Sequence, residues 1–303
     1  MTFEQYRKAL HGVSGVHATA YAADGDIDAA LTGRIVRRIA QAGVHNIVSG
    51  GNTGEFFSLT DAETRRLHAV AIQAAEGGAA VTAAVGRSLK EAIATARAAK
   101  GEGADGVMAH QPRDPFAAPS AQIDYFLDIA DAVDLPVVAY VRADDIPLAE
   151  LVRLATHPAI AGVKFASRNL MLFGDCIRAT QGLGATWICG LAERWALPFY
   201  ALGGAGFTSG LVNVAPELSL ATWRALELGD FSKARHLVDL IAPFEAMRTQ
   251  FHDGANVTVV KEALQLQGLP VGKVRLPGLP ELSGEDRQAL RGILDTWTRA
   301  SAA

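Results

Sequence analysis

The sequence has few of the features that mark membrane, secreted or disulfide-stabilised proteins. No uninterrupted apolar run approaches the roughly 18 residues that cross a bilayer. The first ten residues mix Glu4, Arg7 and Lys8 with apolar side chains and contain no signal-peptide core. Only two cysteines, Cys176 and Cys189, occur in 303 residues. We therefore expect reduced thiols in a cytoplasmic protein that neither spans nor binds a membrane.

The chain also lacks a strong charge and a recognisable metal-ligand pattern. Its formal net charge of −4 gives no electrostatic reason to bind nucleic acid or an anionic membrane. The eight histidines are scattered, with no pair at helical ligand spacing and no clustered carboxylates. We therefore expect no metal and no other cofactor, and an activity that survives prolonged chelation.

What the chain does have is an alternation of short apolar runs with Ala/Leu-rich amphipathic segments. Continuous apolar strands are typical of a parallel sheet covered on both faces. The expected strands are Val13–Ala18, Asn46–Ser49, Ala80–Val85, Gly106–Ala109, Pro136–Val141, Ile160–Phe165, Thr186–Cys189 and Gly206–Leu211. Eight strand–helix units indicate an α/β fold, the (β/α)8 TIM barrel. A Rossmann sheet is disfavoured because the stretch 204–209 lacks the third glycine of a dinucleotide-binding motif.

The helical pattern continues past the last strand–helix unit. Residues 1–229 are predicted to form the barrel catalytic domain, and residues 230–303 a C-terminal helical extension. The expected helices are 27–42, 61–75, 89–101, 121–132, 148–156, 170–180, 193–202 and 217–228 in the barrel, and 231–250, 257–266 and 284–301 in the extension. Thr60, ahead of Asp61 and Glu63, is a predicted N-cap.

A lysine closes one of the predicted strands. Lys164 follows the apolar run Ala159–Val163, which indicates a buried strand. Burial disfavours the ammonium form and lowers the pKa of a lysine, and a neutral lysine attacks a carbonyl carbon to form a Schiff base. The alternative is a strand-end lysine whose ammonium group reaches solvent.

Two other features fall at predicted strand ends, where the active site of such a barrel lies. The stretch Gly50–Glu55 can bring backbone N–H groups to an anion, with Asn52 and Thr53 adding side-chain donors, or it can be a simple tight turn. Tyr140 and Arg142 share one side of a strand by their spacing of two. Near a Schiff-base lysine the tyrosine can transfer protons, and the arginine can bind a carboxylate. A barrel-filling tyrosine and a surface arginine paired with an aspartate are the alternatives.

Other polar residues near strand ends carry weaker signals. His110 can enter the site or be a loop histidine without a role. Glu55 is predicted to be a structural hydrogen-bond acceptor rather than a general base. Arg168 and Asn169 can line a pocket or face solvent, and Cys189 is expected to be a small buried hydrophobe.

In this order, the motifs resemble those of the dihydrodipicolinate synthase / N-acetylneuraminate lyase family of class I aldolases. The resemblance covers nearly the whole chain and includes Gly51–Glu55, Tyr140, His157–Lys164 and Gly204–Pro216. It implies a TIM barrel with a C-terminal helical extension, assembled as a homo-oligomer, either a dimer or a tetramer.

The resemblance also implies roles for individual residues. Lys164 forms a covalent imine with the keto group of a 2-keto acid, and Tyr140 transfers protons. The Asn52-Thr53 loop holds the C1 carboxylate. The predicted substrate-binding residues are Gly51, Asn52, Thr53, Arg142 and Ser209.

Within the family, the chain is similar to the 5-dehydro-4-deoxyglucarate dehydratase branch in Gly54–Thr60, in Tyr140-Val141-Arg142 and in Phe207–Asn213. The synthase branch has an arginine five positions after the tyrosine, where this chain has Asp145. It also has a tyrosine after the fourth strand, and Met108–Pro112 contains none. Both departures argue against lysine-pathway synthesis.

The sequence therefore predicts a Schiff-base-forming lyase acting on a small 2-keto acid, namely a keto-deoxy sugar acid dehydratase. Phe165 stands where the dehydratase branch usually has an acidic residue, so a pyruvate-dependent aldolase with the same residues is the alternative. A third alternative is a non-catalytic keto-acid-binding barrel. The combination of Lys164, Tyr140 and the Gly-rich loop argues against it, because binding alone needs no neutral lysine.

Overall fold

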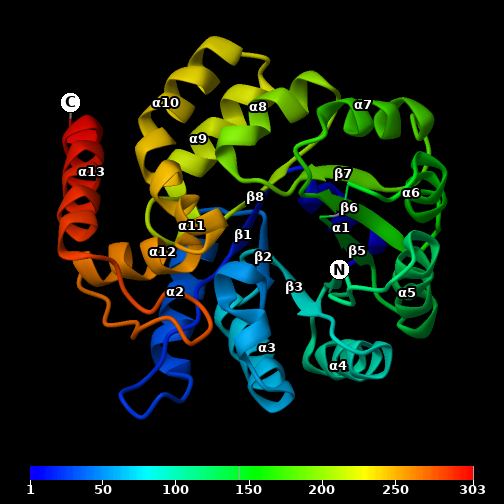
Figure 1. The fold of residues 1–303 in the computed structure, drawn as a ribbon, viewed down its shortest axis with the longest axis horizontal. Helices are drawn as coiled ribbons and strands as arrows, with labels where there is room; N and C mark the ends of the chain where they lie inside the picture. Colours follow the sequence, from blue (N-terminus) through cyan, green and yellow to red (C-terminus); the bar gives the residue numbers. More distant parts are fainter. Residues whose placement is uncertain (143, 303) are drawn as a thin grey trace.

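The computed structural model describes residues 1–142 and 144–302, without the side chains of the last three of these. It confirms the (β/α)8 barrel, because eight parallel strands close in sequential order, β1 to β8, with the last pairing the first (Figure 1). The strands are β1 (Val13–Val16), β2 (Asn46–Ser49), β3 (Ala80–Val85), β4 (Gly106–His110), β5 (Val137–Val141), β6 (Ile160–Phe165), β7 (Thr186–Cys189) and β8 (Phe207–Ser209). Four of the predicted strands have the predicted ends; β1 and β8 are shorter because the chain leaves the sheet before the apolar run stops.

A helix follows each strand and covers the outside of the barrel. These helices are α2 (Ala29–Gln41), α3 (Asp61–Ala75), α4 (Leu89–Glu102), α5 (Pro119–Ala132), α6 (Leu148–Ala155), α7 (Leu170–Ala179), α8 (Glu193–Ala201) and α9 (Pro216–Glu227). The predicted cap of α3 is confirmed, since Thr60 accepts from Glu63 N and the Glu63 carboxylate accepts from Thr60 N.

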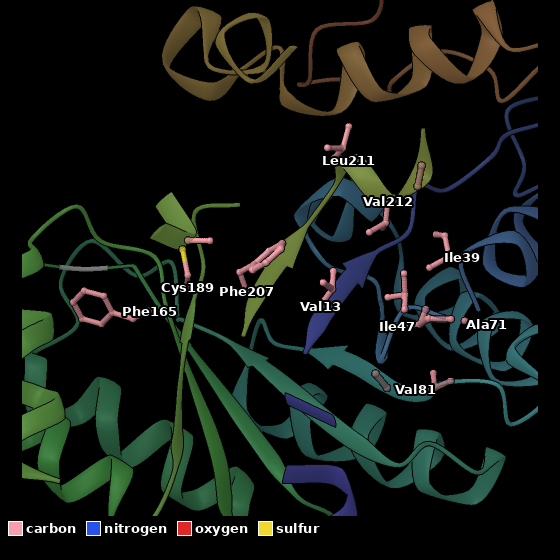
Figure 2. Packing of buried hydrophobic residues seen from close by; sticks show 14 of the residues in the cluster. Val13, Ile39, Ile47, Ala71, Val81, Phe165, Cys189, Phe207, Leu211 and Val212 are labelled. Atoms are coloured by element: carbon pink, nitrogen blue, oxygen red, sulfur yellow. The ribbon is translucent and has the colours of Figure 1, made fainter. Parts of the chain in front are cut away.

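Apolar side chains of the strands fill two separate layers. One set points outward and packs against the surrounding helices; Figure 2 shows Ile39, Ile47 and Val212 gathered beside the strand that carries Val13. The other set points inward and fills the barrel, among them Met108. Both faces of every strand are thus buried, which explains why the strands form continuous apolar runs.

Two of the described α-helices, Phe3–Leu10 and Gln250–Asp253, were not predicted from the sequence. Helix α1 (Phe3–Leu10) packs against the barrel strands and closes its amino-terminal end, where the Tyr6 hydroxyl lies 2.6 Å from Thr82 Oγ1. A Cβ at Gly106 would lie 2.3 Å from the Tyr6 ring, so only glycine leaves room for it. Side chains therefore close the amino-terminal end of the barrel, and a ligand can approach the strands from their carboxyl ends.

The C-terminal helical extension is confirmed as four helices on one side of the barrel (Figure 1). They are α10 (Phe231–Arg248), α11 (Gln250–Asp253), α12 (Asn256–Leu266) and α13 (Gly284–Ala302). Helix α10 packs against α8 and α9, and α12 against the short helix η1 (Asn52–Gly54) after β2. The domain boundary at residue 230 stays a prediction. No helix in the described ranges has the length and apolarity needed to cross a membrane.

Candidate active site

The carboxyl ends of the strands open into a cavity of about 720 Å³. Lys164 lies in its wall, near the end of β6, with 4% of its surface exposed. Burial, with the nearby charge of Arg142 as a second cause, lowers the pKa of Lys164 to about 7. A lysine in this state is substantially neutral near pH 7 and has a free electron pair for a carbonyl carbon. The alternative of an ammonium group reaching solvent does not hold in this structure.

Tyr140 lies directly beside the lysine. The register of β5 and β6 pairs the two residues, and Lys164 Nζ is 3.7 Å from the centre of the Tyr140 ring. The hydroxyl accepts from Asn52 Nδ2 at 3.1 Å and from Arg142 Nη1 at 3.4 Å. Burial raises the pKa of Tyr140, and the charge of Arg142 opposes that shift. The phenol is therefore protonated near neutral pH and placed next to the amine that it would serve.

The loop after β2 reaches the cavity through Asn52 and Thr53. Both belong to η1, and Thr53 is 5% exposed. Gly51 lies outside the cavity wall and close to Val16, where a Cβ would come within 2.5 Å of a methyl group. A substrate contact of the Gly51 backbone thus stays a prediction, whereas the structure does show why this position needs glycine.

Glu55 lines the cavity as well, but its carboxylate holds the end of that loop to the C-terminal extension. Its two carboxylate oxygens accept from Lys261 Nζ at 2.9 Å and from the backbone N–H of Arg275 at 2.8 Å. Glu55 also adopts a left-handed backbone conformation, with φ of 62°. The prediction of a structural acceptor is confirmed, and its partners both come from the C-terminal extension.

Arg142 and Ser209, the two remaining predicted substrate contacts, also line the cavity. Arg142 forms no ion pair in the part of the chain that the structure describes, so a surface pair with Asp144 or Asp145 is not present. Ser209 is buried, and its Oγ lies 3.1 Å from Ser219 Oγ.

The residues with weaker sequence signals differ in whether their side chains reach the cavity. Arg168 lines the cavity, whereas the Asn169 side chain caps α7 by accepting from Leu172 N. His110 ends β4 rather than lying in a loop; it is buried, stacks 4.3 Å from the Phe56 ring and is absent from the cavity wall. Its pKa is lowered to about 3, mainly by burial, so it is neutral at pH 7. Cys189 is a buried thiol, as predicted.

Several cavity residues were missed by sequence reasoning. Arg113 comes from the loop after β4, Arg194 and Trp195 come from the first turn of α8, and Glu245 and Arg248 come from α10 of the extension. Exposed arginines in a loop or at a helix start carry no sequence signal that separates a cavity from solvent. The one available signal was in α10, where Glu245 and Arg248 stand at ion-pair spacing in a helix that must bury one face.

Across residues 1–142 and 144–302, no group of three or more His, Cys, Asp or Glu side chains is placed to hold a metal ion. Metal independence itself stays a prediction that chelation can test.

The chain is similar to proteins of one family over almost its whole length. The model of the dihydrodipicolinate synthetase family matches residues 9–296. A 4-hydroxy-tetrahydrodipicolinate synthase of Methanosphaerula palustris is 37% identical over 264 residues, covering 86% of this chain and 89% of that one. A probable 5-dehydro-4-deoxyglucarate dehydratase of Streptomyces coelicolor is 32% identical over 285 residues, covering 91% and 90%.

Solved structures agree with these sequence matches. The crystal structure of dihydrodipicolinate synthase from Bacillus clausii superimposes with a TM-score of 0.94 at 36% identity, covering 97% of this chain and 99% of that one. Relatives named as synthase and as dehydratase are about equally similar to this chain, so similarity does not choose between the two reactions. The buried lysine, its tyrosine and the match over residues 9–296 lead to one assignment: the chain belongs to the dihydrodipicolinate synthetase family, whose members are lyases of the class I aldolase type.

Proposed function

We propose that the protein is a Schiff-base-forming dehydratase that acts on a keto-deoxy sugar acid, such as 5-dehydro-4-deoxyglucarate. The observation that carries the proposal is Lys164, a buried lysine with a lowered pKa that lines a cavity and packs on a tyrosine ring. Burying a lysine costs folding stability. A buried neutral amine has a chemical use because it can form an imine with a keto group.

In the proposed reaction the Lys164 amine adds to C2 of the keto acid and gives a carbinolamine. Tyr140 protonates the leaving hydroxyl, water departs, and an iminium forms. The iminium acidifies C3, and loss of a C3 proton leaves an enamine whose electron pair expels the C4 hydroxyl as water. Hydrolysis then frees the lysine. A glucarate-derived diacid would lose carbon dioxide as well.

Arginines at the mouth of the cavity support a substrate that carries a second negative charge. Arg113, Arg142, Arg168 and Arg194 all line it, and none forms an ion pair with a carboxylate in the described ranges. Arginine binds carboxylates through parallel hydrogen bonds. The arrangement favours a substrate whose far end is a carboxylate or a hydroxylated tail. One relative is named as a probable 5-dehydro-4-deoxyglucarate dehydratase, and a glucarate derivative carries a carboxylate at each end.

The second candidate is a pyruvate-dependent aldolase. The same iminium and enamine would serve C3–C4 cleavage or its reverse, and the relatives named as synthases favour this class. In either case we propose a metal-independent, cytoplasmic enzyme that acts as a homo-oligomer, a dimer or tetramer, on a small 2-keto acid. A non-catalytic binding barrel would leave the lowered pKa of Lys164 without a use.

A panel of keto-deoxy sugar acids decides between these reactions. Each acid is incubated with the protein and products are identified by mass. A product lighter by water, or by water and carbon dioxide, supports the dehydratase. Pyruvate plus an aldehyde supports the aldolase, and no product from any acid together with no borohydride-trapped adduct contradicts both.

Arg142→Ala tests the far end of the substrate. Its guanidinium lies 3.4 Å from the Tyr140 hydroxyl, in the cavity wall. We expect kcat/KM for the long sugar acid to fall by about a hundredfold, since one charge-assisted contact is lost. Trapping of pyruvate on Lys164 should persist, with its pH dependence moved to higher pH because the charge of Arg142 helps to lower the pKa of that lysine. Equal kcat/KM of variant and wild type on every extended acid would show that Arg142 does not contact substrate.

Lysine-pathway synthesis should be negligible. Asp145 stands where the synthase branch has its arginine, and a carboxylate there repels an acidic second substrate. We expect pyruvate and aspartate semialdehyde to give almost no condensation. A kcat/KM in the usual enzyme range, on the order of 10⁴ M⁻¹s⁻¹ or more, would contradict this prediction.

A further inference from the structure

Arg248 brings the C-terminal extension into the cavity wall. It is the last residue of α10, is 3% exposed and lines the same cavity as Lys164. A Cβ at Gly210 would lie 2.5 Å from Arg248 Nη2 and 3.1 Å from Thr53 Oγ1. The guanidinium and the Thr53 hydroxyl therefore approach the same spot beside Gly210.

Most of the hydrogen-bonding capacity of this guanidinium is unused by the protein. Nη1 donates to Glu245 Oε1 at 2.6 Å and Nη2 donates to Asn256 Oδ1 at 2.9 Å. Nε is buried and has no hydrogen-bond partner among the described residues. Arginine has five N–H donors, and buried donors are normally satisfied. Two contacts hold the group in place and leave donors for an acceptor.

The surroundings keep the guanidinium available for an anion. Glu245 is its only carboxylate partner in the described ranges, and the Glu245 charge also acts on the buried Glu193. Burial, followed by that charge, raises the pKa of Glu193 to about 7, so near neutral pH much of its carboxyl is protonated. Glu193 Oε1 accepts from Ser219 Oγ at 2.6 Å, and Ser219 lies against Ser209. Glu55 and Asp253 also line the cavity, and Glu55 is already paired with Lys261.

We propose that Arg248 is a substrate-binding residue that the extension supplies to the barrel, and that it binds the carboxylate next to the keto carbon together with Thr53. This inference rests on the proposed function for the identity of the ligand, a 2-keto acid. It assigns to α10 a direct part in recognising substrate, with Glu245 and Asn256 as positioning residues.

The test compares a charged and an uncharged ligand. Borohydride trapping measures the concentration of pyruvate, and of its methyl ester, that gives half-maximal adduct on Lys164. In Arg248→Gln we expect the pyruvate concentration to rise roughly 10- to 100-fold, because a charge-assisted contact is lost. The value for methyl pyruvate should change less than about threefold, because the ester has no carboxylate. Arg235→Gln, at an exposed position of the same helix, is the matched control and should change neither value.

A second variant covers the case in which Arg248→Gln does not fold. Gly210→Ala keeps every charge, and its backbone φ of −90° suits alanine, but the new methyl displaces the guanidinium. The same selective loss of pyruvate affinity is expected. An equal loss for both ligands, or no loss for either, would overturn the inference and make Arg248 a purely structural link.

A separate readout keeps this inference distinct from the proposed function. If the wild type traps neither ligand, the Schiff-base proposal fails. Pyruvate should still raise the Tm of the wild type and of Lys164→Ala, since a bound ligand stabilises the folded state, and Arg248→Gln should abolish that rise. A rise that persists in Arg248→Gln would contradict the role of Arg248.

Discussion

Lys164→Ala should lose turnover by on the order of 10⁴-fold or more, because it removes the only nucleophile in the proposed reaction. Borohydride with pyruvate should add mass to the wild type and none to the variant. Peptide mapping should place the adduct on Lys164, whose Nζ lies against the Tyr140 ring. Lys90→Ala, at an exposed position of α4, is the control and should keep both adduct and activity.

The lowered pKa of Lys164 gives this prediction a pH dependence and a sign. Only the neutral amine attacks, so the rate of adduct formation should rise with pH through about 7 and level off above it. Between that value and the pKa of the unfolded state, the unfolded chain binds more protons, so this lysine makes stability increase with pH. Lys164→Met should therefore be at least as stable as the wild type at pH 7. An adduct on another lysine, or a variant with normal turnover, would contradict the mechanism.

Lys261→Ala should cost about 3–5 kcal/mol in the free energy of unfolding, because it leaves a buried carboxylate without its partner. Lys261 and Glu55 are 1% and 2% exposed in their side chains, and their ion pair measures 2.9 Å. Lys261 Nζ also donates to the Lys273 carbonyl oxygen at 2.9 Å. Burial lowers the pKa of Lys261, and the charge of Glu55 opposes that shift. Urea unfolding at pH 7 measures the loss.

A control variant and a double variant separate two effects on the free energy of unfolding, the loss of the buried ion pair and the loss of the lysine side chain. Lys273→Ala removes a solvent-exposed ion pair with Glu281 and should leave the free energy of unfolding nearly unchanged. Lys261→Met with Glu55→Gln removes both charges together and should recover part of the stability that Lys261→Ala loses. Equal unfolding curves for Lys261→Ala and Lys273→Ala would show that the buried pair contributes no more than a surface one.

The barrel could be predicted because its local and global signals agree. Each strand has both faces buried, so it appears in the sequence as a largely apolar run, and the segments between the strands repeat apolar residues at helical spacing. The pairing of Tyr140 with Lys164 followed from strand order, since neighbouring parallel strands end at the same edge. Helix α1 escaped prediction because it is only eight residues long and its polar face outweighs Tyr6 and Leu10.

The extension's part in the cavity could not be predicted for a different reason. Arg248 and Lys261 are far from the barrel strands in sequence, and Lys261 meets Glu55 at a sequence separation of 206. Charged residues on a helix are usually solvated, so nothing in the local pattern marks these two as buried. Only the docking of α10 and α12 on the barrel turns them inward.

The arginines at the mouth of the cavity also bear on how fast a ligand arrives. The chain as a whole is negative, with a formal charge of −4, and so repels anions. The arginines create a local positive potential at the cavity. Such a field speeds the diffusional capture of anions, and added salt screens it within about 10 Å at 0.1 M. Sulfate and phosphate also bind arginine clusters directly. Assays in those buffers will therefore understate the encounter rate of an acidic substrate, whereas dilute buffers of uncharged or cationic species will preserve it.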